Sequence, residues 1–98
     1  MSEVLLGYYK AIEESSRMML QAAQEEDWDG VVRYEGTCAV LIEQLRYRAG
    51  TETLDAQARK EKTRIMQRIL QNDAQIRYLA EPWLAHCEQS LSGSQLLH

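Results

Sequence analysis

The sequence predicts an all-α protein: an antiparallel bundle of three to four long helices, whose last helix is kinked or broken near Pro82. Apolar residues recur at steps of three and four along most of the 98 residues, which is the period of a helix face. The chain has one proline, five glycines and no alternating run rich in Val, Ile and Thr that would indicate a sheet. We expect one helical domain over residues 1–91 and a flexible tail over residues 92–98.

The charge and hydropathy of the chain exclude several classes of partner. A net charge of −4 and a pI near 5.1 argue against nucleic acid or a membrane as partner. No apolar run reaches the roughly 18 residues that a bilayer span requires, and Glu3 stands where a signal peptide would carry basic residues. We therefore expect a cytoplasmic protein in which Cys38 and Cys87 are small core residues rather than a disulfide.

The first helix is predicted from Glu3 to about Gln24. Its apolar residues follow the helical period except at Ser15 and Ser16, where a large residue is due. Four carboxylates then crowd into residues 25–29, which suits a turn and a new helix start better than the middle of a helix. Asp27 is the best N-cap candidate, and the short connection predicts that the first two helices are antiparallel neighbours.

The second helix is predicted from Asp27 to Gly50. Glu35 lies in the middle of its apolar face. Gly36 costs stability inside a helix and is either tolerated or marks the close approach of another backbone. Gly50 is expected to end the helix in the left-handed conformation. The face consists of Trp28, Val31, Glu35, Cys38, Ile42, Leu45 and Ala49.

The third helix is predicted to begin after the capping candidate Thr53 and to run as one kinked element through Pro82 to Leu91. A proline removes a hydrogen-bond donor and clashes with the preceding turn, so a kink or a brief break is expected there. Residues 92–94 then form a flexible link to a short tail. The apolar face keeps its phase across the proline, through Ile65, Ile69, Asn72, Ile76, Leu79 and Trp83.

The residues that commonly carry catalysis do not form a recognisable set in this sequence. His86 and His98 lack a nucleophile and an orienting carboxylate at a familiar spacing. His86 and Cys87 lack two further nearby ligands for a metal, and no Gly-rich loop offers a phosphate site. We predict that the chain is not an enzyme and that it uses no cofactor and no metal.

Glu35 is the most informative single residue of the second helix. When the helices are folded back about their loops, Glu35 comes level with the middle of the first and third helices, where Asn72 lies. One interpretation is a polar layer of Glu35 and Asn72 that fixes the register of the helices or meets a partner group. The other is that the face is wide enough for Glu35 to lean into solvent.

Two surfaces are candidates for contact with other proteins. The start of the third helix carries five basic residues, which are either a solvated helix face or a dock for an acidic partner. The Met-rich and aromatic apolar surface exceeds what three helices need to cover one another, which favours a homodimer face or a groove for a client protein. We predict that the partner-binding residues are Val32, Ala39, Ile65, Met66, Ile69, Ile76, Leu79 and Trp83.

Two segments resemble the FliT family of flagellar export chaperones. The first joins residues 20–23 (LQAA) to residues 27–35 (DWDGVVRYE), and the second joins residues 69–79 (ILQNDAQIRYL) to residues 81–84 (EPWL). The resemblance covers almost the whole chain and lies in the order and spacing of these motifs. It implies a cytosolic helical chaperone that binds the filament-cap protein before export and prevents its early assembly. It also implies a homodimer, contact with export ATPase components and, in some bacteria, restraint of the flagellar master transcriptional regulator.

The expected mechanism is the binding of an amphipathic client helix along the second and third helices. The segment after Pro82 is the candidate for a movable cover, because the proline gives it a natural hinge. Two other functions stay open at this point. The first is a homodimeric scaffold without a client. The second is an antagonist of the transcriptional regulator that acts through the basic start of the third helix.

Overall fold

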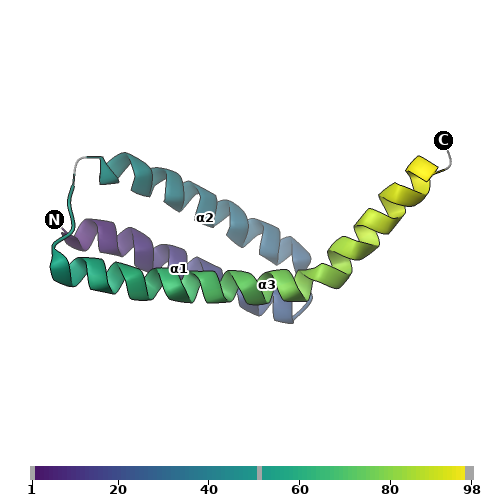
Figure 1. Ribbon diagram of the computed structural model, residues 1–98, viewed down its shortest axis with the longest axis horizontal. Coiled ribbons are helices and arrows are strands. Elements are labelled where there is room, and N and C mark those ends of the chain that lie inside the picture. The colour runs from purple at the N-terminus through teal and green to yellow at the C-terminus, as the bar shows by residue number, and fades with distance from the viewer. Residues whose placement is uncertain (1, 51, 97–98) are drawn as a thin grey trace.

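The computed structural model describes residues 2–50 and 52–96, with the side chains of residues 4–50 and 52–82. It contains three helices: α1 (Ser2–Gln24), α2 (Trp28–Ala49) and α3 (Ala56–Leu96). Figure 1 shows α2 running back along α1, and α3 then following the direction of α1. The predicted all-α class and antiparallel bundle are therefore confirmed.

The three helices do not pack equally on one another. Helix α1 packs against both α2 and α3, whereas no Cα atom of α2 comes within 8 Å of a Cα atom of α3 in the described part of the chain. The two later helices are thus held together through α1 and are separated from each other. This arrangement leaves the inner faces of α2 and α3 incompletely covered.

The core lies along α1. Its buried residues are Leu5 and Ile12 of α1 and Leu45 of α2. Leu54, which precedes α3, and Ile69 of α3 pack against them. No large side chain among those described is completely buried. The core is therefore thin, as expected for a small bundle of long helices with a high ratio of surface to volume.

The turn between α1 and α2 is closed by backbone hydrogen bonds around Glu26. The Asp27 N–H donates to the Ala22 carbonyl at 2.8 Å, and the Glu26 N–H donates to the Ala23 carbonyl at 3.1 Å. This pair of bonds is a Schellman motif, in which the residue at the position of Glu26 adopts the left-handed conformation. Glu26 has φ of 59°, the one positive φ among the described residues.

Glu26→Gly should raise the free energy of unfolding by about 1 kcal/mol, because glycine adopts the left-handed conformation without the steric cost of a Cβ. Thermal unfolding followed by circular dichroism measures the change. Glu26→Ala removes the same charge but keeps a Cβ, so it should not reproduce the gain. Equal stabilisation by both variants would show that charge repulsion, rather than backbone conformation, limits this turn.

Asp27 caps α2, as the sequence predicts. Its Oδ1 accepts from the Gly30 N–H at 3.0 Å. Gly30 is buried at this corner, and a Cβ built there would lie 2.5 Å from Asp27 Oδ2 and 3.2 Å from the Ala22 Cβ. The close approach of two helices therefore occurs at Gly30, whereas a Cβ at Gly36 would meet nothing within 4 Å.

Alanine should consequently have opposite effects at the two glycines. Gly36→Ala should raise the free energy of unfolding by about 0.5–1 kcal/mol through helix propensity alone. Gly30→Ala should lower it by about 1 kcal/mol, because the added methyl displaces the capping carboxylate and crowds Ala22. Urea unfolding of the two variants tests this, and stabilisation by Gly30→Ala would contradict the packing of this corner.

The predicted N-cap of α3 and the predicted conformation of Gly50 at the end of α2 are wrong. Asp55, rather than Thr53, caps α3: its Oδ1 accepts from the Ala58 N–H at 2.8 Å, because Asp55 directly precedes the first helical residue and so reaches the third amide. Gly50 has φ of −70° and ψ of −17°, which is a right-handed conformation. Its N–H turns back to the Arg48 carbonyl, so α2 ends without a left-handed residue.

Helix α3 continues through Pro82 and ends at Leu96. Figure 1 shows that its last part turns away from α1 and α2, which agrees with the expected kink. The helix extends beyond Leu91, where the sequence led us to expect its end, and includes residues 92–94. The division into a domain over 1–91 and a flexible tail over 92–98 stays a prediction, and residues 97–98 lie outside the described residues.

Candidate functional site: an apolar groove between α2 and α3

A groove of about 680 Å³ lies between α2 and α3, where the two helices diverge. Helix α1 forms its floor with Ile12, Ser16 and Met19. The volume falls within the range of about 300–1,000 Å³ that is common for ligand sites. The α2 wall consists of Trp28, Val31, Val32, Glu35, Cys38, Ala39 and Ile42, and the α3 wall of Ile69, Asp73, Ile76, Arg77 and Ala80.

Four of the predicted partner-binding residues line this groove. They are Val32 and Ala39 on α2, and Ile69 and Ile76 on α3. Val32 is 59% exposed, so more than half of its surface is open to solvent in the empty groove. The groove thus brings together residues that are far apart in the sequence.

The other four predicted residues lie elsewhere. Ile65 is buried at 5% exposure beside a small charged hollow formed by α1 and α3. Met66 is 37% exposed but does not line the groove. Leu79 lines a separate shallow depression with Tyr78, and the side chain of Trp83 lies outside the described side chains.

The two residues predicted to form a polar layer take different positions. Asn72 Nδ2 donates to Ser16 Oγ at 3.0 Å, which links α3 to α1. Ser16 is buried at 4% exposure, and its hydroxyl donates to the Glu13 carbonyl at 2.8 Å. Glu35 is exposed on the α2 wall of the groove, and no hydrogen bond joins it to Asn72 in the described part of the chain.

Sequence reasoning missed several residues of the site. Ile12, Trp28, Val31 and Ile42 also line the groove, although periodicity marks them only as members of apolar helix faces. Met19, which belongs to the Met-rich surface, lines the groove as well. The bond between Ser16 and Asn72 had a visible signal, because serine interrupts the apolar period of the first helix where α1 meets Asn72.

Cys38 is a free and partly buried thiol on the α2 wall. Burial raises the pKa of the Cys38 thiol above its usual value, and the neighbouring Glu35 carboxylate raises it further, while a hydrogen bond with Ser15 acts in the opposite direction. The thiol therefore stays protonated, and hence unreactive, to higher pH than a free cysteine.

Alkylation of Cys38 by iodoacetamide should show a pH midpoint above that of a small free thiol, because only the thiolate reacts. Glu35→Gln should lower this midpoint, although not to the value of a free thiol, since the burial remains. Peptide-resolved mass spectrometry separates Cys38 from Cys87 in this measurement. A midpoint below that of the free thiol would contradict the described surroundings of Cys38.

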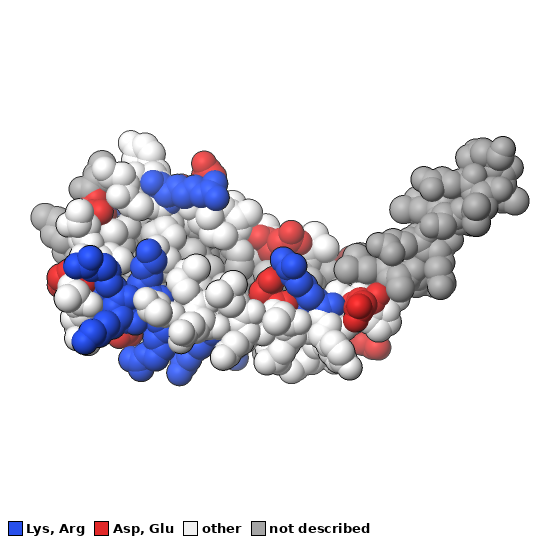
Figure 2. Space-filling model, viewed as in Figure 1, with Lys and Arg blue, Asp and Glu red and all other residues white. Residues whose placement is uncertain are grey.

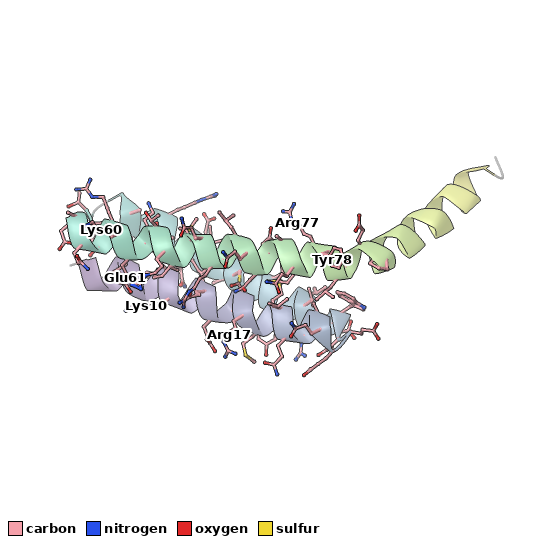
Figure 3. The ribbon with its side chains drawn as sticks, turned by 60° about the horizontal axis from the view of Figure 1, so that its bottom comes forward. Lys10, Arg17, Lys60, Glu61, Arg77 and Tyr78 are labelled. Carbon is pink, nitrogen blue, oxygen red and sulfur yellow. The ribbon has the colours of Figure 1, made fainter. Side chains whose placement is uncertain are left out.

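Charged side chains are unevenly distributed along the bundle. Figure 2 shows Lys and Arg gathered over the start of α3, and Figure 3 shows Lys60, Glu61 and Lys10 at that same end. Two ion pairs occur here, between Arg64 and Glu61 at 3.7 Å and between Arg68 and Glu13 at 3.6 Å. Their arginines are well exposed, so these pairs contribute little to stability.

The fold and the groove define a class of protein: a small bundle of three long helices with an open, largely apolar groove between two of them. Over the described residues, none of the three helices combines the length and hydrophobicity needed to cross a bilayer. Comparison with curated proteins finds no match.

The family model described as "Flagellar protein FliT" matches residues 6–96. The crystal structure of flagellar protein FliT from Bordetella bronchiseptica superimposes with a TM-score of 0.75 and 36% sequence identity, covering 87% of this chain and 96% of that one. The chain therefore belongs to the FliT family of flagellar proteins, which confirms the resemblance seen in the sequence. Membership gives it a general chaperone-like role in flagellum biogenesis.

Proposed function

We propose that this chain is a flagellar export chaperone that binds the filament-cap protein through the α2–α3 groove. Binding there would cover an assembly segment of the cap protein, prevent its premature assembly and deliver it to the export apparatus. The observation that carries the proposal is the separation of α2 from α3 over an apolar floor. A closed bundle would have buried these faces against each other.

The dimensions of the groove fit one helix of a client. The α2 wall runs from Trp28 to Ile42, which spans about 21 Å at the helical rise of 1.5 Å per residue. This length matches roughly four turns of a client helix, whose apolar side chains at i, i+3, i+4 and i+7 would enter the groove. Figure 1 shows the last part of α3 leading away from α1 and α2, so the trough is open in this arrangement.

Isothermal titration of purified filament-cap protein into this chain tests the proposal directly. We expect saturable binding, with a negative heat-capacity change because apolar surface is buried on association. An absence of binding at high micromolar concentration of both proteins, with both folded by circular dichroism, would refute the proposal.

The basic start of α3 favours a second contact on the same chain. Arg59, Lys60, Lys62, Arg64 and Arg68 lie within residues 56–68 of α3, where Glu61 is the one carboxylate. This surface would take an acidic segment of an export ATPase component or of the flagellar transcriptional regulator. Lys60→Glu should then weaken binding of that partner and leave binding of the cap protein unchanged.

The remaining exposed apolar side chains are consistent with a homodimer. Tyr47 and Tyr78 are 84% and 76% exposed, and neither lines the groove. A dimer through such residues would leave the α2–α3 groove accessible to a client. Sedimentation equilibrium over a hundredfold range of concentration measures this association.

A further inference from the structure

We infer that the occupant of the α2–α3 groove is an amphipathic helix whose apolar face carries one lysine or arginine, which pairs with Glu35. The inference rests on the proposed function, since it specifies the chemistry of the helix that the groove accepts. It follows from the position of one carboxylate in a wall that is otherwise almost entirely apolar.

Glu35 lies in the middle of the α2 wall. Val31 and Val32 precede it by one turn, and Cys38 and Ala39 follow it by one turn, all on the same wall of the groove. Glu35 is exposed to solvent when the groove is empty. It has no ion-pair partner in the described part of the chain.

The other charged residues of the groove compensate each other. Arg77 Nε contacts Asp73 Oδ2 at 2.9 Å on the same helix face. Arg33, which is close to Glu35 in sequence, lies 4.0 Å from Asp27 instead. Both arginines lie against other carboxylates, and Glu35 is the charged residue of the groove that forms no ion pair among the described residues.

A helix that fills the groove must remove water from the α2 wall. Removing water from an unpaired carboxylate is unfavourable, whereas a cation placed against it restores the lost interaction. A client that is apolar along its whole inner face would meet this penalty at Glu35, and one with a basic residue at that level would not. Glu35, the one carboxylate of the α2 wall, thus selects for a basic residue and fixes the register of the client helix.

Synthetic peptides test the inference without knowledge of the client sequence. The probe is a 16-residue amphipathic helix of leucine and alanine with a polar outer face, long enough for about four turns. A set of variants places one lysine at each apolar position in turn. Each peptide is titrated against the wild-type chain, Glu35→Leu and Glu35→Gln, and against Glu43→Gln, which removes a carboxylate of α2 that does not line the groove.

We expect the order of affinities of wild type and Glu35→Leu to depend on whether the peptide carries a lysine. For at least one lysine position, wild type should bind the lysine peptide about tenfold more tightly than Glu35→Leu does, a difference of about 1.4 kcal/mol. The all-apolar peptide should instead bind Glu35→Leu more tightly than wild type, because in the variant no carboxylate is buried when the peptide binds. Glu43→Gln should behave as wild type with every peptide.

Three results would overturn the inference in distinguishable ways. If all peptides bind but their affinities do not depend on the residue at position 35, the groove binds helices and the charge selection is wrong. If no peptide binds any variant although the filament-cap protein does, the occupant is not an amphipathic helix of this kind and the inference fails alone; if neither the peptides nor the cap protein bind, the proposed function fails as well.

Discussion

Val32→Asp should weaken binding of the filament-cap protein by about 30-fold or more, which corresponds to about 2 kcal/mol. Val32 lies on the groove wall with 59% of its surface exposed, so the free protein tolerates a polar residue there. A bound client helix would cover this position. The variant then loses the burial of a valine, worth about 1.5–3 kcal/mol, and must bury an unpaired carboxylate in addition.

Val40→Asp is the matched control for this prediction. Val40 is on the same helix, is 58% exposed and does not line the groove. Both substitutions place the same poor helix former in α2 and should therefore lower the melting temperature by similar amounts. Equal loss of binding in the two variants would locate the client outside the groove or attribute its loss to general damage of α2.

Ile65→Ala should lower the free energy of unfolding by about 3 kcal/mol, because it removes buried methyl groups and leaves a cavity between α1 and α3. Ile65 is 5% exposed, and the thin core contains few other large side chains to collapse into the space. For a domain of this size the melting temperature should fall by about 12 °C or more. Thermal unfolding followed by circular dichroism measures the change.

Leu70→Ala provides the comparison for Ile65→Ala. Leu70 is on the same helix and is 61% exposed, so its truncation should change stability by less than about 0.5 kcal/mol. Below its melting temperature, Ile65→Ala should still bind the cap protein, because Ile65 contributes to folding rather than to the groove. A loss of binding without a loss of stability would instead make Ile65 a contact residue.

Local features of the fold were predictable where one residue determines them. Asp27 caps α2 because a carboxylate just before an apolar helix face can accept from the free amides of the first turn. Pro82 lies inside α3, whose last part turns away from α1 and α2 (Figure 1), as expected of a ring that obstructs the preceding turn. Boundaries with competing candidates were less predictable. Thr53 and Asp55 are both suitable N-cap residues, and only the structure shows that Asp55 caps α3. Glu26 adopts the left-handed conformation, which glycine usually supplies at the end of a helix.

The candidate site was predictable as a set of faces but not as a groove. Periodicity identifies the inward sides of α2 and α3, which include Val32, Ala39, Ile69 and Ile76. It carries no information on the separation of two helices that are both held by a third. For this reason Ile65 and Ile69, one turn apart on α3, could not be assigned from sequence to the buried seam and the open groove respectively.

We expect the α2–α3 groove to be the surface that receives a client. Methyl NMR of the chain titrated with filament-cap protein measures this at individual residues. The largest shift changes should occur at Val32, Ile42, Ile69 and Ile76, whose methyl groups line the groove. Changes confined to Val4, Val40 and Leu70, which are exposed elsewhere, would contradict this expectation.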